Sequence, residues 1–158
     1  MAVHPRTRRP PARAAARAAL RNDVVIAGIA LLAAYDLALA VFMAAWPHAF
    51  YVHVGPFGLR NDHYIRDTAT FNAAVGVGLA LALRRPSWRV PMLAITTLQF
   101  ALHSINHLVD IDKAYPAWNG YFDFFSLAVA TIAIAGLLRV ARGDAEAGAG
   151  RSWKGANR

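Results

Sequence analysis

The sequence predicts an all-α fold, specifically an integral membrane four-helix up-down bundle. Three observations predict it. Hydrophobic residues make up 57% of the 158-residue chain, above the roughly 45–50% usual for soluble domains. They gather in four segments of about 20–24 residues, each long enough to cross a hydrocarbon core of about 30 Å. The connections between these segments are short, which favours antiparallel neighbours.

The net charge of +8 is distributed in a way that predicts topology. Fourteen of the 17 basic residues fall in residues 1–21, 84–89 and 139–158, which alternate with the apolar segments. This is the positive-inside pattern, and it places both termini in the cytoplasm. Because topology accounts for the charge, we expect the lipid bilayer as a partner and no nucleic acid.

The elements follow in order along the chain. Residues 1–22 are rich in Arg, Pro and Ala and predict a disordered basic cytoplasmic arm. Residues 23–140 predict the four-transmembrane-helix bundle, with helices over 23–46, 63–83, 90–110 and 120–140. Asn61 or Asp62 is placed to cap the second helix. The Gly/Ala-rich residues 141–158 predict a disordered cytoplasmic tail.

Aromatic residues gather at the helix ends opposite the basic segments. Part of this pattern is typical of an interfacial belt. The outer end of the bundle is richer in such residues than the inner end, so we expect the function there. The residues concerned are Trp46, Phe50, Tyr51, Phe57, Tyr64, Tyr115, Trp118, Tyr121 and Phe122.

A polar stripe follows the third predicted helix. Projected at 100° per residue, six polar side chains share one face about 100° wide, and almost all the other positions are aliphatic. In lipid, such a stripe must face the bundle interior or a water-filled cavity. The six residues are Thr96, Gln99, His103, Asn106, His107 and Asp110.

The other helices carry polar groups at similar depth. Near the start of the second helix, His63, Arg66 and Asp67 share one face, and the fourth helix contributes Asp123. Asp36 and Asn72 fall closer to the membrane midplane. Ionisable groups at such depth indicate a functional site, because burying each costs about 2.5–3.5 kcal/mol or more. The predicted pocket therefore comprises Asp36, His63, Arg66, Asp67, Asn72, Gln99, His103, Asn106, His107, Asp110 and Asp123.

A divalent metal is one alternative occupant of this pocket. His103 and His107 lie four residues apart, a spacing that lets two imidazoles hold one ion, and His63 and Asp67 repeat the spacing. The glutamate of the zinc-protease motif is replaced by Ser104, and Arg66 would repel a cation. The chain has no cysteine, which excludes thiol chemistry and cysteine-ligated zinc.

Three functions remain open at this stage. The first is a pocket that binds a small ligand, either as an enzyme or as a subunit of a membrane redox complex; no motif assigns catalytic residues to it. The second is a structural or accessory membrane subunit whose polar groups lock helix packing. The third is a proton- or ion-linked transporter, which the scarcity of polar groups below Asp36 disfavours.

The chain resembles the DoxX-like small four-helix membrane proteins of bacteria. The resemblance covers roughly residues 23–140 and rests on the four short-looped spans, on "GPFGLRNDHYIRDTATFN" and on "LQFALHSINHLVD". It implies a multi-pass protein of the bacterial cytoplasmic (inner) membrane, with a partner in quinone-linked redox or thiol-stress complexes. No catalytic residue is carried over from that group, and the lack of cysteine weakens a thiol-based role.

Overall fold

The computed structural model describes residues 12–156, and the side chains of residues 12–147. Within that range the chain is helical apart from its loops and one isolated bridge between Phe57 and Ala114. The all-helical prediction is therefore confirmed for the described residues. The elements are α1 (Ala12–Ala45), α2 (Pro47–His53), α3 (Asp62–Arg84), the 3-10 turn η1 (Pro86–Trp88), α4 (Arg89–Val109) and α5 (Trp118–Ala156).

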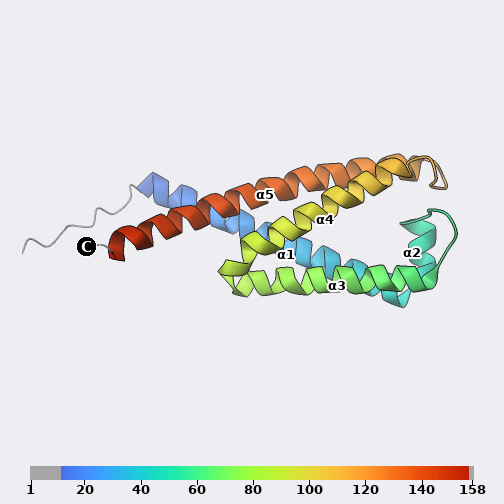
Figure 1. Cartoon of the computed structure of the whole chain (residues 1–158), viewed down its shortest axis with the longest axis horizontal. Helices are drawn as coiled ribbons and strands as arrows, with labels where there is room; N and C mark the ends of the chain where they lie inside the picture. Colours follow the sequence, from blue (N-terminus) through green and yellow to red (C-terminus); the bar gives the residue numbers. More distant parts are fainter. Residues whose placement is uncertain (1–11, 157–158) are drawn as a thin grey trace, which may run out of the picture.

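The four long helices form two pairs. α1 packs mainly on α3, and α4 packs mainly on α5, with fewer contacts between the pairs. Figure 1 shows the pairs separating toward the end of the molecule where α2 lies, which we call the α2 end. At the opposite end, α1 and α5 extend past the turn that joins α3 to α4.

Two of these helices are longer than the sequence predicts. α1 begins at Ala12 and not at Asp23, so residues 12–22 of the expected disordered arm are helical. This stretch consists mainly of Ala and Arg, which have high helix propensities. α5 continues through the expected disordered tail to Ala156. The two extensions meet where Arg21 and Asp144 approach to 3.3 Å. Residues 1–11 of the predicted arm lie outside the described residues.

The segment after α1, predicted as a loop, contains the short helix α2. α2 begins at Pro47, whose fixed φ and missing N–H suit the first helical position. The cap of α3 agrees with expectation, since the side chain of Asn61 accepts hydrogen bonds from the backbone N–H groups of His63 and Tyr64 at 3.0 and 3.2 Å. The other bounds of α3 and α4 fall within a residue or so of those predicted.

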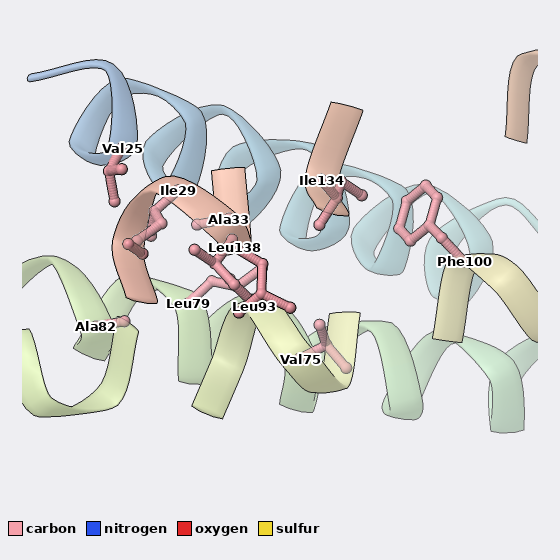
Figure 2. Packing of buried hydrophobic residues seen from close by; sticks show 11 residues of the cluster. Val25, Ile29, Ala33, Val75, Leu79, Ala82, Leu93, Phe100, Ile134 and Leu138 are labelled. Atoms are coloured by element: carbon pink, nitrogen blue, oxygen red, sulfur yellow. The ribbon is translucent and has the colours of Figure 1, made fainter. Parts of the chain in front are cut away.

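The hydrophobic core fills the space between the helices on the side away from α2. Ile29, Leu79 and Leu93 are fully buried there, and Figure 2 shows Leu79, Leu93 and Leu138 close together between the ribbons. Phe100 is the member of this cluster nearest the α2 end in Figure 2. Phe100 packs against the core and also lines a cavity, so it separates the close-packed core from that cavity.

Close helix contact in the α1–α3 pair depends on a glycine. A Cβ placed on Gly76 would lie 3.1 Å from the backbone nitrogen of Leu37 and 2.8 Å from its Cγ. Gly76 thus lets the two helices approach closely, as small residues do in membrane helix pairs. Gly76 belongs to the buried face of α3, together with Asn72, Val75 and Leu79.

Candidate ligand pocket between the helices

A cavity of about 340 Å³ lies between the two helix pairs at the α2 end. This volume is at the lower end of the range of about 300–1,000 Å³ typical of small-molecule sites. All five helices and the loop after α2 contribute to its wall. The lining residues are Tyr35, Leu39, Met43, Phe50, Tyr51, Gly55, Phe57, Leu59, Asn61, Tyr64, Ile65, Thr68, Phe71, Asn72, Gln99, Phe100, His103, His107 and Leu127.

Two histidines of α4 form the most polar part of the wall. Because they are four residues apart, His103 and His107 lie on the same helix face, and their Nε2 atoms are 3.0 Å apart. The ring of Phe57 packs edge-on against His107, with ring centroids 4.8 Å apart. At a separation of 3.0 Å only one of the two Nε2 atoms can carry a hydrogen, so one imidazole donates to the other.

Asp123 of α5 lies on the far side of this pair. Its Oδ2 atom is 3.9 Å from the Nδ1 atom of His107, and the side chains of His107 and Asp123 are only 15% and 18% exposed. That distance exceeds a hydrogen bond, but it places the carboxylate opposite the ring nitrogen that does not face His103. Neither atom has a hydrogen-bond partner in the described part of the chain.

The deeper end of the cavity is lined by two amide side chains. Asn72 is buried, and its Nδ2 donates to the backbone oxygen of Thr68 at 2.9 Å and lies 3.9 Å from the sulfur of Met43. Gln99 places its Oε1 in a buried position where no described residue donates to it. Asp36 is more deeply buried still, at 1% exposure, and does not line the cavity.

The predicted polar face of α3 points away from the cavity. The side chains of His63 and Asp67 pair with each other at 3.4 Å and are 79% and 62% exposed, and Arg66 is exposed beside them. The opposite face of α3, with Ala69 and Asn72, is the buried one. Helical periodicity correctly places His63, Arg66 and Asp67 together, but the α1–α3 contact turns them outward.

Two further residues of the predicted pocket lie outside it. Asn106 is exposed on α4. Asp110 caps the end of α4 and binds Lys113, with Nζ and Oδ1 2.7 Å apart. This hydrogen bond raises the pKa of Lys113 above its usual value. Of the eleven predicted residues, only four line the cavity: Asn72, Gln99, His103 and His107. Asp123 does not line it but lies beside His107.

The predicted metal set is not assembled in the structure. His103 and His107 are together, but His63 and Asp67 are on the outer face of α3. Among the described residues, no group of three or more His, Cys, Asp or Glu side chains is placed to hold one ion. The physical reason is again the rotation of α3, which separates the two pairs that share the i, i+4 spacing.

Most of the cavity wall is aromatic and aliphatic, whereas the pocket predicted from the sequence consists of polar residues. Phe50, Tyr51, Phe57 and Tyr64 belong to the aromatic cluster of which part was expected to form an interfacial belt, and they line the cavity. The feature of the sequence that indicates these lining residues is the concentration of aromatic residues at this end of the bundle. By contrast, Trp118, Tyr121 and Phe122 are exposed, as a belt requires. Comparison with protein-family models, curated proteins and solved structures gave no match for this chain.

Proposed function

We propose that this chain is a multi-pass membrane protein whose cavity at the α2 end is an outward-facing site for a small ligand. Both α1 and α5 are long and apolar enough to cross a membrane. Only 11% of the apolar window of α5 is buried within the protein. A core helix of a soluble protein would be mostly buried, so the exposure of α5 favours a lipid environment.

The shorter helices support the same proposal. α3 and α4 have 23 and 21 residues, enough for about 30 Å at roughly 1.5 Å per residue. Leu98, Leu102 and Ile105 of α4 are each more than half exposed, while the polar residues Gln99, His103 and His107 face the cavity. Apart from Asn106 near its end, α4 thus combines an apolar outside with a polar side toward the cavity, which fits a bundle in lipid.

The distribution of basic residues supports an orientation. Arg84, Arg85 and Arg89 surround η1, at the end opposite α2, and the guanidinium of Arg85 lies over the ring of Trp88. The basic residues near both termini belong to the same side in an up-down bundle. By the positive-inside rule this side is cytoplasmic, so the cavity opens to the outside of the bacterial inner membrane.

The single observation that carries the ligand-binding proposal is the cavity of about 340 Å³ that holds both histidines of α4. It combines apolar walls with a few converging polar groups, the composition typical of small-molecule sites. Polar atoms left without partners beside it, such as Gln99 Oε1, favour a ligand that pairs with them. An enzymatic or redox-complex role would use the same pocket.

One contact favours the structural alternative. The hydroxyls of Ser104 and Thr131 lie 3.4 Å apart and link α4 to α5. Such links are worth only about 0.6 kcal/mol on average in one membrane protein. They stabilise a helix pair but leave the unpaired groups at the cavity unexplained.

Cysteine labelling tests the proposal directly, because the natural chain has no cysteine. We expect His103→Cys to react at least about tenfold faster than Leu102→Cys with a membrane-impermeant thiol reagent added to spheroplasts. His103 lines the cavity, whereas its neighbour Leu102 is 58% exposed on the outside of α4. In water the exposed Leu102→Cys would react at least as fast.

The two positions make a matched pair, and each result has a clear meaning. Equal, fast labelling would show that α4 is not in lipid and would contradict the membrane proposal. Slow labelling of both would show that the cavity does not open outward. Reporter fusions at Gly58 and Arg158 should independently give opposite sides of the membrane, and a shared side would contradict the orientation.

A further inference from the structure

Apart from its two histidines and its tyrosines, the cavity has no ionisable acid or base among its described lining residues. Within the described part of the chain, no Lys, Arg, Asp or Glu is among the residues that line it. An ionised ligand would lose most of its hydration on entering such a wall without gaining an opposite charge, which is costly. The aromatic rings of Tyr35, Phe50, Phe57, Phe71 and Phe100 favour an apolar body instead.

The position of Asp123 favours one direction for the hydrogen bond between His103 and His107. Asp123 keeps 18% of its side chain exposed near the α2 end, and an ionised carboxylate only accepts hydrogen bonds. It therefore favours the tautomer in which Nδ1 of His107 carries the hydrogen. The Nε2 atom of the neutral His107 is then an acceptor, and the Nε2 atom of His103, 3.0 Å away, must donate to it.

This arrangement of Asp123, His107 and His103, which we call the relay, leaves the Nδ1 atom of His103 as an acceptor. A neutral imidazole has one N–H, and that of His103 is already used on His107. His103 lines the cavity, and the nitrogen of the pair that remains for a ligand is its Nδ1 atom, which offers a lone pair. Asp123 and His107 act as positioning residues, because they set the tautomer of His103.

The deeper amides offer acceptors as well. The Nδ2 group of Asn72 is held by Thr68 and Met43, which leaves its Oδ1 atom for other contacts. The Oε1 atom of Gln99 is buried with no donor among the described residues. The buried Oε1 atom of Gln99 is complemented by a ligand that brings an O–H or N–H.

We propose that the pocket binds an uncharged, largely apolar alcohol or phenol, whose hydroxyl donates to Nδ1 of His103. This inference rests on the proposed ligand-binding function and adds the chemical class of the ligand. The apolar body would lie against the aromatic walls, and a membrane-soluble molecule of this class could enter from the outer leaflet.

A phenol and its methyl ether test the class. The probes are 4-hexylphenol and 4-hexylanisole, which share an apolar body but differ in the hydroxyl hydrogen. Binding is measured by equilibrium dialysis with nanodiscs that contain the full chain, after subtracting uptake by empty nanodiscs. We expect the phenol to bind about fivefold more tightly, the ratio that one neutral hydrogen bond supplies.

Variants of two histidines provide the control. His103→Phe keeps a planar ring but removes both nitrogens, so it should abolish the preference for the phenol. His63→Phe changes the same residue type on the exposed face of α3, where the side chain is 79% exposed, and should retain the preference. Equal affinities of the wild-type chain for both probes would overturn the inference while leaving the pocket in place. If neither probe binds, the inference fails, whereas the proposed function is still decided by the cysteine labelling of His103→Cys and Leu102→Cys.

Nitrogen-15 spectra of the histidines test the relay without any variant. We expect His107 protonated at Nδ1 and His103 protonated at Nε2 in the wild-type chain in lipid bilayers. The opposite tautomers would make His103 Nδ1 a donor. That result would overturn the inference and indicate a carbonyl ligand.

Discussion

Asp36 is predicted to destabilise the protein in which it is buried. Its side chain is 1% exposed, and its Oδ2 atom has no hydrogen-bond partner in the described part of the chain. It lies nine residues before the end of α1 at Ala45, which is about 14 Å along the helix at 1.5 Å per residue. Replacement by asparagine keeps the shape and removes the charge, so Asp36→Asn should stabilise the fold.

The expected gain in the free energy of unfolding follows from the burial of Asp36. An unpaired buried polar group costs about 1–3 kcal/mol, and an amide avoids part of that cost. We therefore expect a gain of about 1–2 kcal/mol in the free energy of unfolding. For a chain of this length, each kcal/mol moves the melting temperature by about 2–4 °C. Thermal melts of the detergent-solubilised protein at pH 7, followed by circular dichroism, should rise by about 2–8 °C.

The reverse change at Asn72 is the matched control. Asn72→Asp removes the donor that binds the backbone oxygen of Thr68 and adds a carboxylate at a buried position, so it should lower the melting temperature. A melting temperature of Asp36→Asn below that of the wild type would refute the reasoning, because it would show that Asp36 has a stabilising partner. A gain in stability with loss of probe binding would indicate that Asp36 is kept for function.

Three further predictions concern packing and charge. Gly120→Ala should destabilise strongly, by about 2 kcal/mol or more, because a Cβ there would overlap the backbone oxygen of Ile111; chemical denaturation would measure it. Gly76→Ala should lower the melting temperature, whereas Gly136→Ala, which meets nothing within 4 Å, should leave it unchanged or raise it through helix propensity worth up to about 1 kcal/mol. Arg21→Gln should change stability by less than about 1 kcal/mol, since its pair with Asp144 is solvent-exposed, and a larger loss would show that the helix extensions depend on that pair.

The sequence by itself determined the helical class and the local features of each helix. The spacing of apolar residues located α3 and α4 to within a residue or so. Asn61 or Asp62 was expected to cap α3, and the structure has Asn61 in that position. The period of 3.6 residues also placed His103 and His107 on one face. Each of these depends on residues only a few positions apart, so no knowledge of the rest of the fold was needed.

The sequence pattern misjudged the ends of the long helices. Residues 12–22 and 141–156 look like polar tails in composition, yet they continue α1 and α5. Composition describes what can be buried in lipid, whereas a helix can continue beyond such a segment, and in residues 12–22 the high helix propensities of Ala and Arg support it. The apolar segment that predicts a helix can therefore be shorter than the helix itself, as in α1 and α5.

The tertiary structure decided which polar face points inward. Periodicity shows that His63, Arg66 and Asp67 share a face of α3, but it contains no information on how that face is rotated in the molecule. In the structure the face with Gly76 packs closely against Leu37 of α1, Asn72 is buried on it, and His63 and Asp67 point outward. The tertiary structure also brought aromatic residues from α2 and its loop against α4 to form the cavity. Contacts between segments distant in the chain depend on packing in three dimensions, which a one-dimensional pattern does not contain.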